Sequence, residues 1–218
     1  MPFRNRVTPL GELIATPARG LVFGNRGRLH DDERRIRRQW ALKRWIACRL
    51  EFRGRYHGAM PPRRYTGLFF LDEATAFAAG HRPCAECRRA DYLRFTEIWG
   101  ARADAIDARL HEERLGPRRE DEIRRLPDGA FVLLDGAPWL ALGDKLLRWT
   151  PGGYADRIGR PSGRATILTP PSLVEVLRQG WDGEVPFLHP SAVGGAHPGG
   201  GLGAGRAGEA HGAVERPA

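Results

Sequence analysis

The chain has 218 residues, of which 41% are hydrophobic, and a formal net charge of +9 at pH 7. This content is sufficient for a folded core, while three cysteines are too few for a disulfide scaffold. The longest apolar runs are far shorter than the roughly 20 residues that a membrane span requires, and residues 1–6 lead into no secretory hydrophobic segment. We therefore expect a cytoplasmic protein with no membrane partner.

The positive charge is concentrated in the first third of the chain. Residues 1–66 contain 16 lysines and arginines against 5 acidic residues, a net charge of +11, whereas the remainder has a net charge of −2. A concentrated basic region attracts a phosphate backbone and releases its counterions. The charge thus favours a nucleic acid, DNA first, as partner. The alternative is an arginine-rich composition typical of a GC-rich genome, with a basic face that serves solubility alone.

The first elements predicted along the chain are short. Residues 7–16 read as a turn followed by a strand, and the glycine-rich residues 17–29 as an irregular loop. Over residues 42–52, apolar and polar side chains alternate with a period of two. This alternation predicts a strand with an inward face formed by Ile46, Cys48, Leu50 and Phe52.

A strand, a helix and a cysteine pair are predicted next. Residues 53–64 form a loop that contains His57, and residues 65–71 a second strand. Asp72 is a good N-cap for a short helix that ends at Gly80. After the cysteine pair, residues 89–115 have apolar side chains at helical spacing and predict one long or broken amphipathic helix.

The second half of the chain is predicted to be mainly β. Asp135-Gly136 indicates a hairpin turn, and a helix over residues 172–179 has Ser172 as its cap. The candidate strands are residues 131–134, 138–142, 146–150 and 165–168. We expect an α+β fold: a small zinc-supported unit of strand, helix and cysteine knuckle, joined to a helix and a mainly β region. The expected boundaries are residues 1–116, 117–191 and a disordered glycine-rich tail over 192–218.

Cys84-x-x-Cys87 is the motif with the clearest chemistry. Two thiolates at this spacing can bind one metal ion from a single tight turn, each sulfur about 2.3 Å from a zinc. A redox-active pair is the alternative, but a thioredoxin-like motif opens a helix directly after a strand, and this pair follows the end of a helix. Cys48, the third cysteine, is either a further ligand or a small buried core residue.

The residues around this pair resemble the metal-binding domain of the Ada DNA-repair family. The shared features are an aromatic pair, a short alanine-rich helix, a Gly-x-Arg-Pro-Cys turn and a second cysteine; here they are Phe69-Phe70, Glu73 to Ala79, Gly80 to Cys84, and Cys87. The resemblance covers about 35 residues, roughly Arg53 to Arg89, and its most specific part is the Ala-Ala-Gly-His-Arg-Pro-Cys turn.

The resemblance implies a zinc site with two more ligands upstream. In the family these are a pair of cysteines, and the second one corresponds in spacing to His57, a residue that can also bind zinc. The first one corresponds to Arg53, which cannot. The implied ligand set is Cys48, His57, Cys84 and Cys87, with His30 or His81 as alternatives to His57.

The family's function implies zinc-supported contact with DNA. In the family, one zinc-bound thiolate accepts a methyl group from a damaged DNA phosphate, and that acceptor position is Arg53 here. We therefore expect the zinc to be structural and the protein to contact phosphates through basic side chains, among them Arg44, Arg53, Arg55, Arg63 and Arg64.

The alternative function is a zinc-dependent enzyme, either a hydrolase or one that transfers an alkyl group to a zinc thiolate. Its site would lie near His30 and the metal. The candidate acid and base groups are His30, Asp31 and the run His111-Glu112-Glu113. For that run, the competing interpretation is a solvated charged face of a helix.

Overall fold

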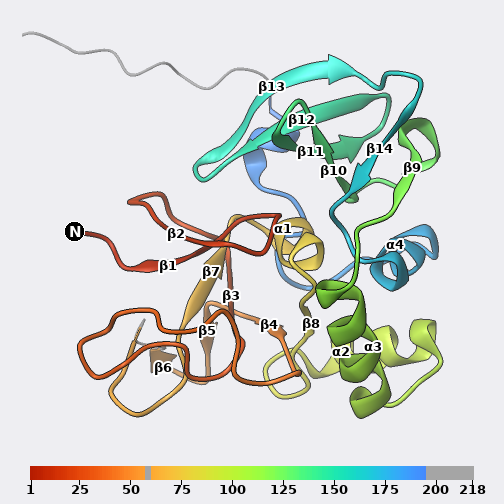
Figure 1. Cartoon of the computed structure of the whole chain (residues 1–218). Coiled ribbons are helices and arrows are strands. Elements are labelled where there is room, and N and C mark those ends of the chain that lie inside the picture. The colour runs from red at the N-terminus through yellow and green to blue at the C-terminus, as the bar shows by residue number, and fades with distance from the viewer. Residues whose placement is uncertain (57–59, 195–218) are drawn as a thin grey trace, which may run out of the picture.

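The computed structural model describes residues 1–56 and 60–194, with Arg55 and Tyr56 described by their backbone alone. The chain has the predicted α+β fold, in which two sheets and four α-helices pack together (Figure 1). The predicted ligand His57 and residues 195–218, most of the predicted tail, lie outside the described residues. Within the described part of the chain, no helix combines the length and the apolar character needed to cross a membrane.

The first sheet is built from the N-terminal third and the segment before the cysteine pair. Its strand order is β2-β1-β7-β3-β4-β8. The last pairing, β4 with β8, is parallel, and it brings together the two segments that carry the cysteines. The strands are β1 (Arg4–Val7), β2 (Leu13–Ala15), β3 (Val22–Asn25), β4 (Ile46–Cys48), β7 (Leu68–Phe70) and β8 (Arg82–Pro83). A separate hairpin consists of β5 (Glu51–Phe52) and β6 (Arg55–Tyr56).

The second sheet is antiparallel, with its strands in the order β13-β12-β11-β10-β14-β9, and β10 to β13 form a meander within it. The predicted Asp135-Gly136 turn joins β10 to β11, with Asp135 and Gly136 both at positive φ. The strands are β9 (Glu120–Glu122), β10 (Phe131–Leu134), β11 (Ala137–Leu142), β12 (Lys145–Thr150), β13 (Gly153–Gly159) and β14 (Arg164–Ile167). Strands β9 and β13 were not among the predicted elements.

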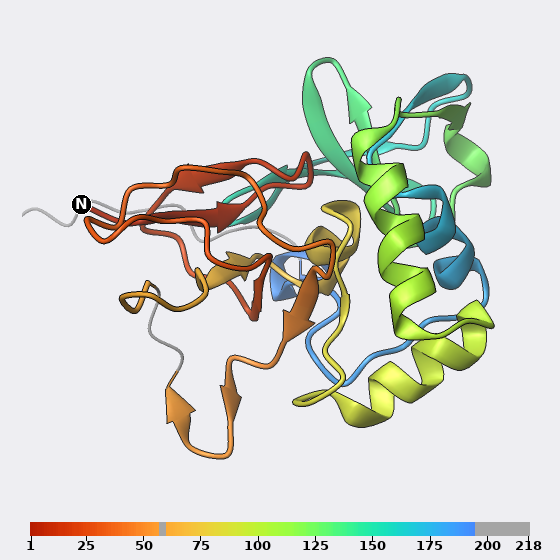
Figure 2. The ribbon, with the colours of Figure 1, turned by 60° about the horizontal axis from the view of Figure 1, so that its bottom comes forward.

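The helices are α1 (Glu73–Ala78), α2 (Arg89–Trp99), α3 (Ala103–Leu115) and α4 (Pro171–Arg178), with short 3₁₀ turns at Ile123–Arg125 and Pro190–Ala192. Helices α2, α3 and α4 gather on one side of the molecule (Figures 1 and 2). The predicted helix over residues 89–115 is broken at Gly100, which caps α2 in the left-handed conformation at φ 71°.

Helix α1 connects the two sheets. As predicted, Asp72 caps it, since its side chain accepts a hydrogen bond from the amide of Thr75 over 2.9 Å. All six residues of α1 are buried. Ala76 packs into the core of the first sheet, Ala74 into a core on the second sheet, and Phe77 into a third cluster with α2, α3 and α4. The helix is therefore shared by all three clusters.

Two local predictions in the first sheet are wrong. Residues 17–29 contain β3, a central strand, because Gly24 permits a close approach: a Cβ atom there would lie 2.2 Å from the carbonyl oxygen of Ile46. The strand predicted over residues 42–52 is shorter, since β4 ends at Cys48 and Leu50 is 45% exposed. The inward orientation of Cys48 is confirmed.

The predicted cap of α4 is also wrong. This helix begins at Pro171, and its N-cap is Pro170. Ser172 instead donates its hydroxyl to the Glu113 carboxylate over 2.6 Å, so it joins α4 to α3. A pattern that is local in the sequence could not reveal this long-range partner.

Candidate metal centre

The three cysteines of the chain come together at one end of the first sheet. The sulfur atoms of Cys48, Cys84 and Cys87 all lie within 4.8 Å of one another. The residues are 6%, 7% and 8% exposed, respectively. Three thiols at such distances could hold a metal ion. Among the described residues, no fourth His, Cys, Asp or Glu belongs to this group.

Strand pairing places Cys48 beside Cys84. Strands β4 and β8 run parallel, with Ala47 opposite Pro83. The amide of Cys84 donates to the carbonyl of Ala47 over 2.9 Å, and the amide of Arg82 donates to the carbonyl of Trp45 over 3.1 Å. Cys48 ends its strand and Cys84 directly follows its own, so the two side chains leave the sheet at the same edge.

Backbone amides surround the sulfur atoms of the Cys-x-x-Cys turn. The amide of Glu86 donates to the sulfur of Cys84 over 3.4 Å, and the amide of Cys87 also hydrogen-bonds this sulfur. The amide of Arg49 hydrogen-bonds the sulfur of Cys87. Such bonds stabilise negative charge on sulfur. The turn is therefore suited to present thiolates.

The three thiols influence one another's ionisation. Hydrogen bonds from Cys48 and Cys87 lower the pKa of Cys84, and the Cys84 sulfur in turn raises the pKa of Cys48. One thiolate is thus favoured beside two thiols, since a second negative charge at this distance is repelled. A cation is needed to stabilise all three as thiolates.

Aromatic and aliphatic side chains enclose the cysteine group. Phe23, buried on β3, belongs to the same cluster as the cysteines, and its ring meets the ring of Phe69 edge to face at 5.5 Å. Phe52 and Tyr65 also pack against the cluster, one before and one after the segment of chain that contains His57. The described ends of the segment between Phe52 and Tyr65 therefore both lie at the cysteine group.

Buried ion pairs fix the elements that carry the cysteines. Arg88, directly after Cys87, lies 2.5 Å from the carboxylate of Glu73 and 2.6 Å from that of Asp91. Arg82 of β8 makes a bidentate pair with Asp107 of α3, at 2.9 and 2.8 Å. No local pattern predicts the pairs of Arg82 with Asp107 and of Arg88 with Glu73, since these partners on α3 and α1 are remote in the chain.

His81 and His30, the two alternatives to His57 as fourth ligand, both lie outside the cysteine group. His81 is buried between the rings of Trp45 and Phe70, at centroid distances of 5.2 and 4.6 Å. Its Nε2 atom accepts a hydrogen bond from Arg26 over 3.2 Å. Burial, with the nearby charge of Arg26, lowers the pKa of His81 well below its usual value.

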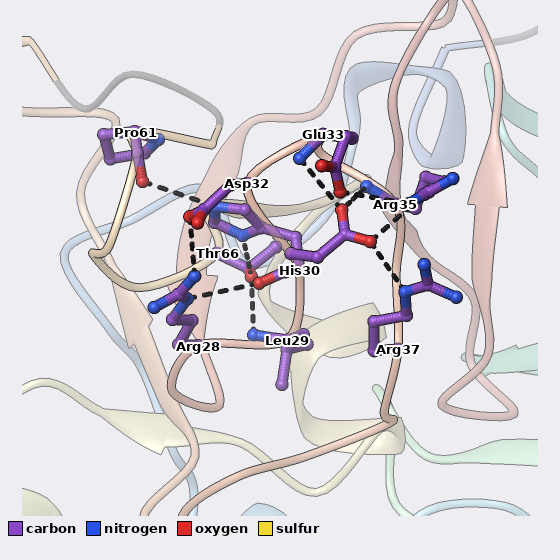
Figure 3. A network of polar contacts seen from close by, with 10 residues as sticks. Arg28, Leu29, His30, Asp32, Glu33, Arg35, Arg37, Pro61 and Thr66 are labelled. Carbon is purple, nitrogen blue, oxygen red and sulfur yellow. Dashed lines mark hydrogen bonds and ion pairs between the residues drawn. The ribbon is translucent and has the colours of Figure 1, made fainter.

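His30 is part of a structural loop (Figure 3). Its Nδ1 atom lies 2.6 Å from the hydroxyl of Thr66, and its Nε2 atom lies 3.3 Å from the carbonyl oxygen of Pro61. Asp31 is engaged as well, since its carboxylate accepts hydrogen bonds from the side chains of Arg35 and Arg37. The contacts of Asp31 lie within the loop of residues 28–37, and those of His30 fasten this loop to Pro61 and Thr66.

The run His111-Glu112-Glu113 does not converge on one point. His111 is buried on α3 with its ring edge to face with that of Trp40, at 4.6 Å. Glu113 binds Ser172 and Arg109, while Glu112 is exposed. The three side chains therefore have separate surroundings.

The predicted nucleic-acid contacts are exposed where they are described. Arg44, Arg53, Arg63 and Arg64 all lie on the surface, and the side chain of Arg55 lies outside the described residues. Arg53 is in the left-handed conformation at φ 53°, at the β5–β6 turn, and its guanidinium lies 5.0 Å from the ring centroid of Phe52. It is thus close to the aromatic shell of the cysteine group.

Comparison of the chain with models of protein families, with curated proteins and with solved structures finds no match in any of the three.

Proposed function

We propose that this protein binds zinc through Cys48, His57, Cys84 and Cys87 as a structural centre, and that it contacts nucleic acid through the basic surface of its first third. The observation that carries the proposal is the convergence of all three cysteine sulfurs within 4.8 Å. Thiolates are soft donors that suit zinc, and three of them with one imidazole form a common structural donor set.

Two observations support His57 as the fourth ligand. The residues on either side of its segment, Phe52 and Tyr65, both pack against the cysteine group, so both described ends of the segment that contains His57 lie beside this group. His30 and His81 have hydrogen-bonding partners elsewhere. The Ada-like spacing of the sequence points to the same residue.

A structural role for the metal agrees with the surroundings of the sulfurs. Each cysteine is less than one-tenth exposed, and the strands and helix that carry them are fixed by buried pairs of Arg82 and Arg88. A closed, rigid site of this kind contributes to folding. A bulky phosphotriester would have poor access to Cys48, which argues against alkyl transfer to this thiolate.

Support for nucleic acid comes from arginines that retain their charge at the surface. Arg35 and Arg37 are neutralised in part by Asp31. Among the described residues of the basic third, by contrast, eight exposed arginines form no ion pair: Arg4, Arg19, Arg34, Arg38, Arg44, Arg53, Arg63 and Arg64. Unpaired guanidinium groups bind phosphate without first breaking a bond to a carboxylate.

The metal part of the proposal is tested by elemental analysis of the purified protein. We expect about one zinc per chain in wild type and loss of zinc in Cys84→Ser. Because the metal supports folding, a chelator should lower the midpoint of thermal unfolding in wild type. A folded wild-type protein that neither contains nor takes up zinc would overturn this part.

The nucleic-acid part is tested by fluorescence anisotropy with single- and double-stranded oligonucleotides. Affinity should fall at least tenfold between about 50 and 200 mM salt, and Arg63→Gln/Arg64→Gln should weaken it further. The matched control is Arg102→Gln/Arg124→Gln, which removes the same charge from exposed positions outside the basic third. Absence of binding at low salt would refute this part and leave the zinc centre unaffected.

The enzyme alternative gains no support from the described residues. Both ring nitrogens of His30 have partners outside the cysteine group, at Thr66 and Pro61. His111 lies on α3, against Trp40 and apart from the cysteine group. We therefore retain a single candidate function.

A further inference from the structure

A cavity of about 1070 Å³ lies away from the cysteine group, between the first sheet and helices α3 and α4. Its walls come from β2 and the loop before it, from the end of α1, from residues 113–121, and from α4. None of the three cysteines lines it. Small-molecule sites have about 300–1,000 Å³, so this cavity is large enough for a whole metabolite.

One wall of the cavity carries arginines that bind only carbonyl oxygens and a neutral ring. Arg26 donates to the carbonyl of Gly11 over 2.8 Å and to His81. Arg114 donates to the carbonyls of Gly80 and Lys43, at 2.6 and 2.7 Å. Carbonyl oxygens orient a guanidinium but leave its full positive charge in place.

Both guanidiniums also stack on one tryptophan. The central carbon of Arg26 lies 3.9 Å from the ring centroid of Trp45, and that of Arg114 lies 4.1 Å from it. Arg26 is completely buried, and within the described chain its Nη2 atom has no hydrogen-bond partner. Burial lowers the pKa of Arg26 to about 9 and that of Arg114 to about 10. An anion nearby would relieve this cost.

A third arginine extends this cationic wall to the surface. Arg118 is exposed, and it donates to the carbonyl of Leu10 over 3.0 Å. In the part of the chain that is described, none of Arg26, Arg114 and Arg118 forms an ion pair; Glu12 lies near Arg118 at longer range. A ligand can therefore meet Arg118 directly, in the same cavity that the buried Arg26 and the half-buried Arg114 line.

Three of the five acidic residues that line the cavity are paired with arginines that are not part of the arginine wall, while Glu12 and Glu120 form no ion pair among the described residues. The carboxylate of Glu113 pairs with Arg109 at 2.9 Å and accepts a hydrogen bond from Ser172. Asp121 and Glu175 both lie near Arg178, at 3.9 and 3.5 Å. Arg26, Arg114 and Arg118 thus have no carboxylate in direct contact, although Glu12 and Glu120 also line the cavity.

An exposed tryptophan stands at the cavity beside this wall. Trp40 is 37% exposed, and His111 holds its ring edge to face. It belongs to the same surface segment as the exposed Arg38 and Arg44. A large aromatic face next to fixed positive charge is the combination by which proteins bind a base together with its phosphate.

We propose that this cavity binds a nucleotide, with the phosphate at Arg118 on the wall that also carries Arg26 and Arg114, and the base against Trp40. The nucleotide is either a free mononucleotide or one unit of a bound nucleic acid. The second source rests on the proposed nucleic-acid function, because the segment that carries Trp40 would then also contact the polymer. The first source does not.

The experiment is calorimetric titration of the full chain with adenosine monophosphate, and with adenosine and inorganic phosphate as partial ligands. The nucleotide should bind more tightly than either part. Trp40→Ala and Arg118→Gln should each weaken nucleotide binding about tenfold. The matched controls are Leu93→Ala and Arg124→Gln, both at exposed positions outside the cavity, and they should leave the affinity unchanged. Thermal unfolding confirms that each variant is folded.

The outcomes separate this inference from the proposed function. Failure of the folded wild type to bind adenosine monophosphate, or equal affinity in Trp40→Ala, overturns the cavity site even where oligonucleotides bind. Nucleotide binding without oligonucleotide binding supports the cavity as a site for free mononucleotides and refutes the polymer. If adenosine monophosphate and oligonucleotides both bind, and Trp40→Ala weakens the binding of each, the occupant of the cavity is one nucleotide of a bound nucleic acid.

Discussion

The amide of Cys84 donates a hydrogen bond to the carbonyl of Ala47 over 2.9 Å. This bond lies between two short parallel strands, β4 and β8, and it brings Cys48 next to the Cys-x-x-Cys turn. The metal centre therefore depends on the first sheet as much as on the turn itself. Changes in the sheet should affect the metal.

The first prediction concerns Gly24 on β3, the strand paired with β4. Gly24→Ala would place a Cβ atom 2.2 Å from the carbonyl oxygen of Ile46, so the strands must separate. We expect a loss of about 1–3 kcal/mol in the free energy of unfolding, measured by urea denaturation, together with weaker zinc binding. Gly159→Ala is the control, since a Cβ atom there meets nothing within 4 Å. Equal stability of the two variants would contradict this view of β3.

The second prediction concerns the buried pair of Arg82 and Asp107. Asp107→Asn leaves the guanidinium of Arg82, which is 2% exposed, without its charged partner. The free energy of unfolding should fall by about 3–5 kcal/mol. At the exposed pair of Arg109 and Glu112, by contrast, Glu112→Gln should cost less than about 1 kcal/mol. Similar losses in the two variants would show that Arg82 does not depend on Asp107.

The third prediction is a pH dependence from His81. Its folded-state pKa is lowered by burial, so the unfolded chain binds the proton more readily. The contribution of His81 to stability is therefore complete above the unfolded pKa of about 6.5 and is lost as pH falls below it. Urea denaturation between about pH 7 and pH 5 should show a smaller loss of stability for His81→Gln than for wild type. Loss of metal at low pH affects wild type and His81→Gln alike. The difference between their two slopes of unfolding free energy against pH therefore reports the protonation of His81. Identical slopes would contradict a neutral buried His81.

Local signals were sufficient to predict several elements that position the site. Asp72 and Gly80 mark the two ends of α1, and the alternation around Cys48 correctly indicated that this side chain points inward. Each of these features is decided by residues close in the sequence. The convergence of Cys48 with Cys84 and Cys87 was inferred from the resemblance, and the sulfur distances agree with it.

Other features depend on partners far along the chain and left no local pattern. The glycine-rich residues 17–29 read as a loop, although Gly24 lies in β3 and is required by the close approach of the backbone of β4. The amide of Glu73 bonds the carbonyl of Pro186, so the C-terminal segment covers the start of α1. The cavity likewise depends on residues that are distant in the sequence, since Arg26 and Arg114 meet at Trp45 only in the folded chain.

The measurement that tests the central claim most directly is zinc X-ray absorption on the purified protein, with wild type, His57→Ala and a control, His211→Ala. We predict a zinc coordinated by three sulfur atoms and one nitrogen in wild type and in the control, with sulfur distances of about 2.3 Å, and loss of the nitrogen ligand in His57→Ala. A zinc with fewer than three sulfur ligands, or a nitrogen ligand that persists in His57→Ala, would contradict this metal centre.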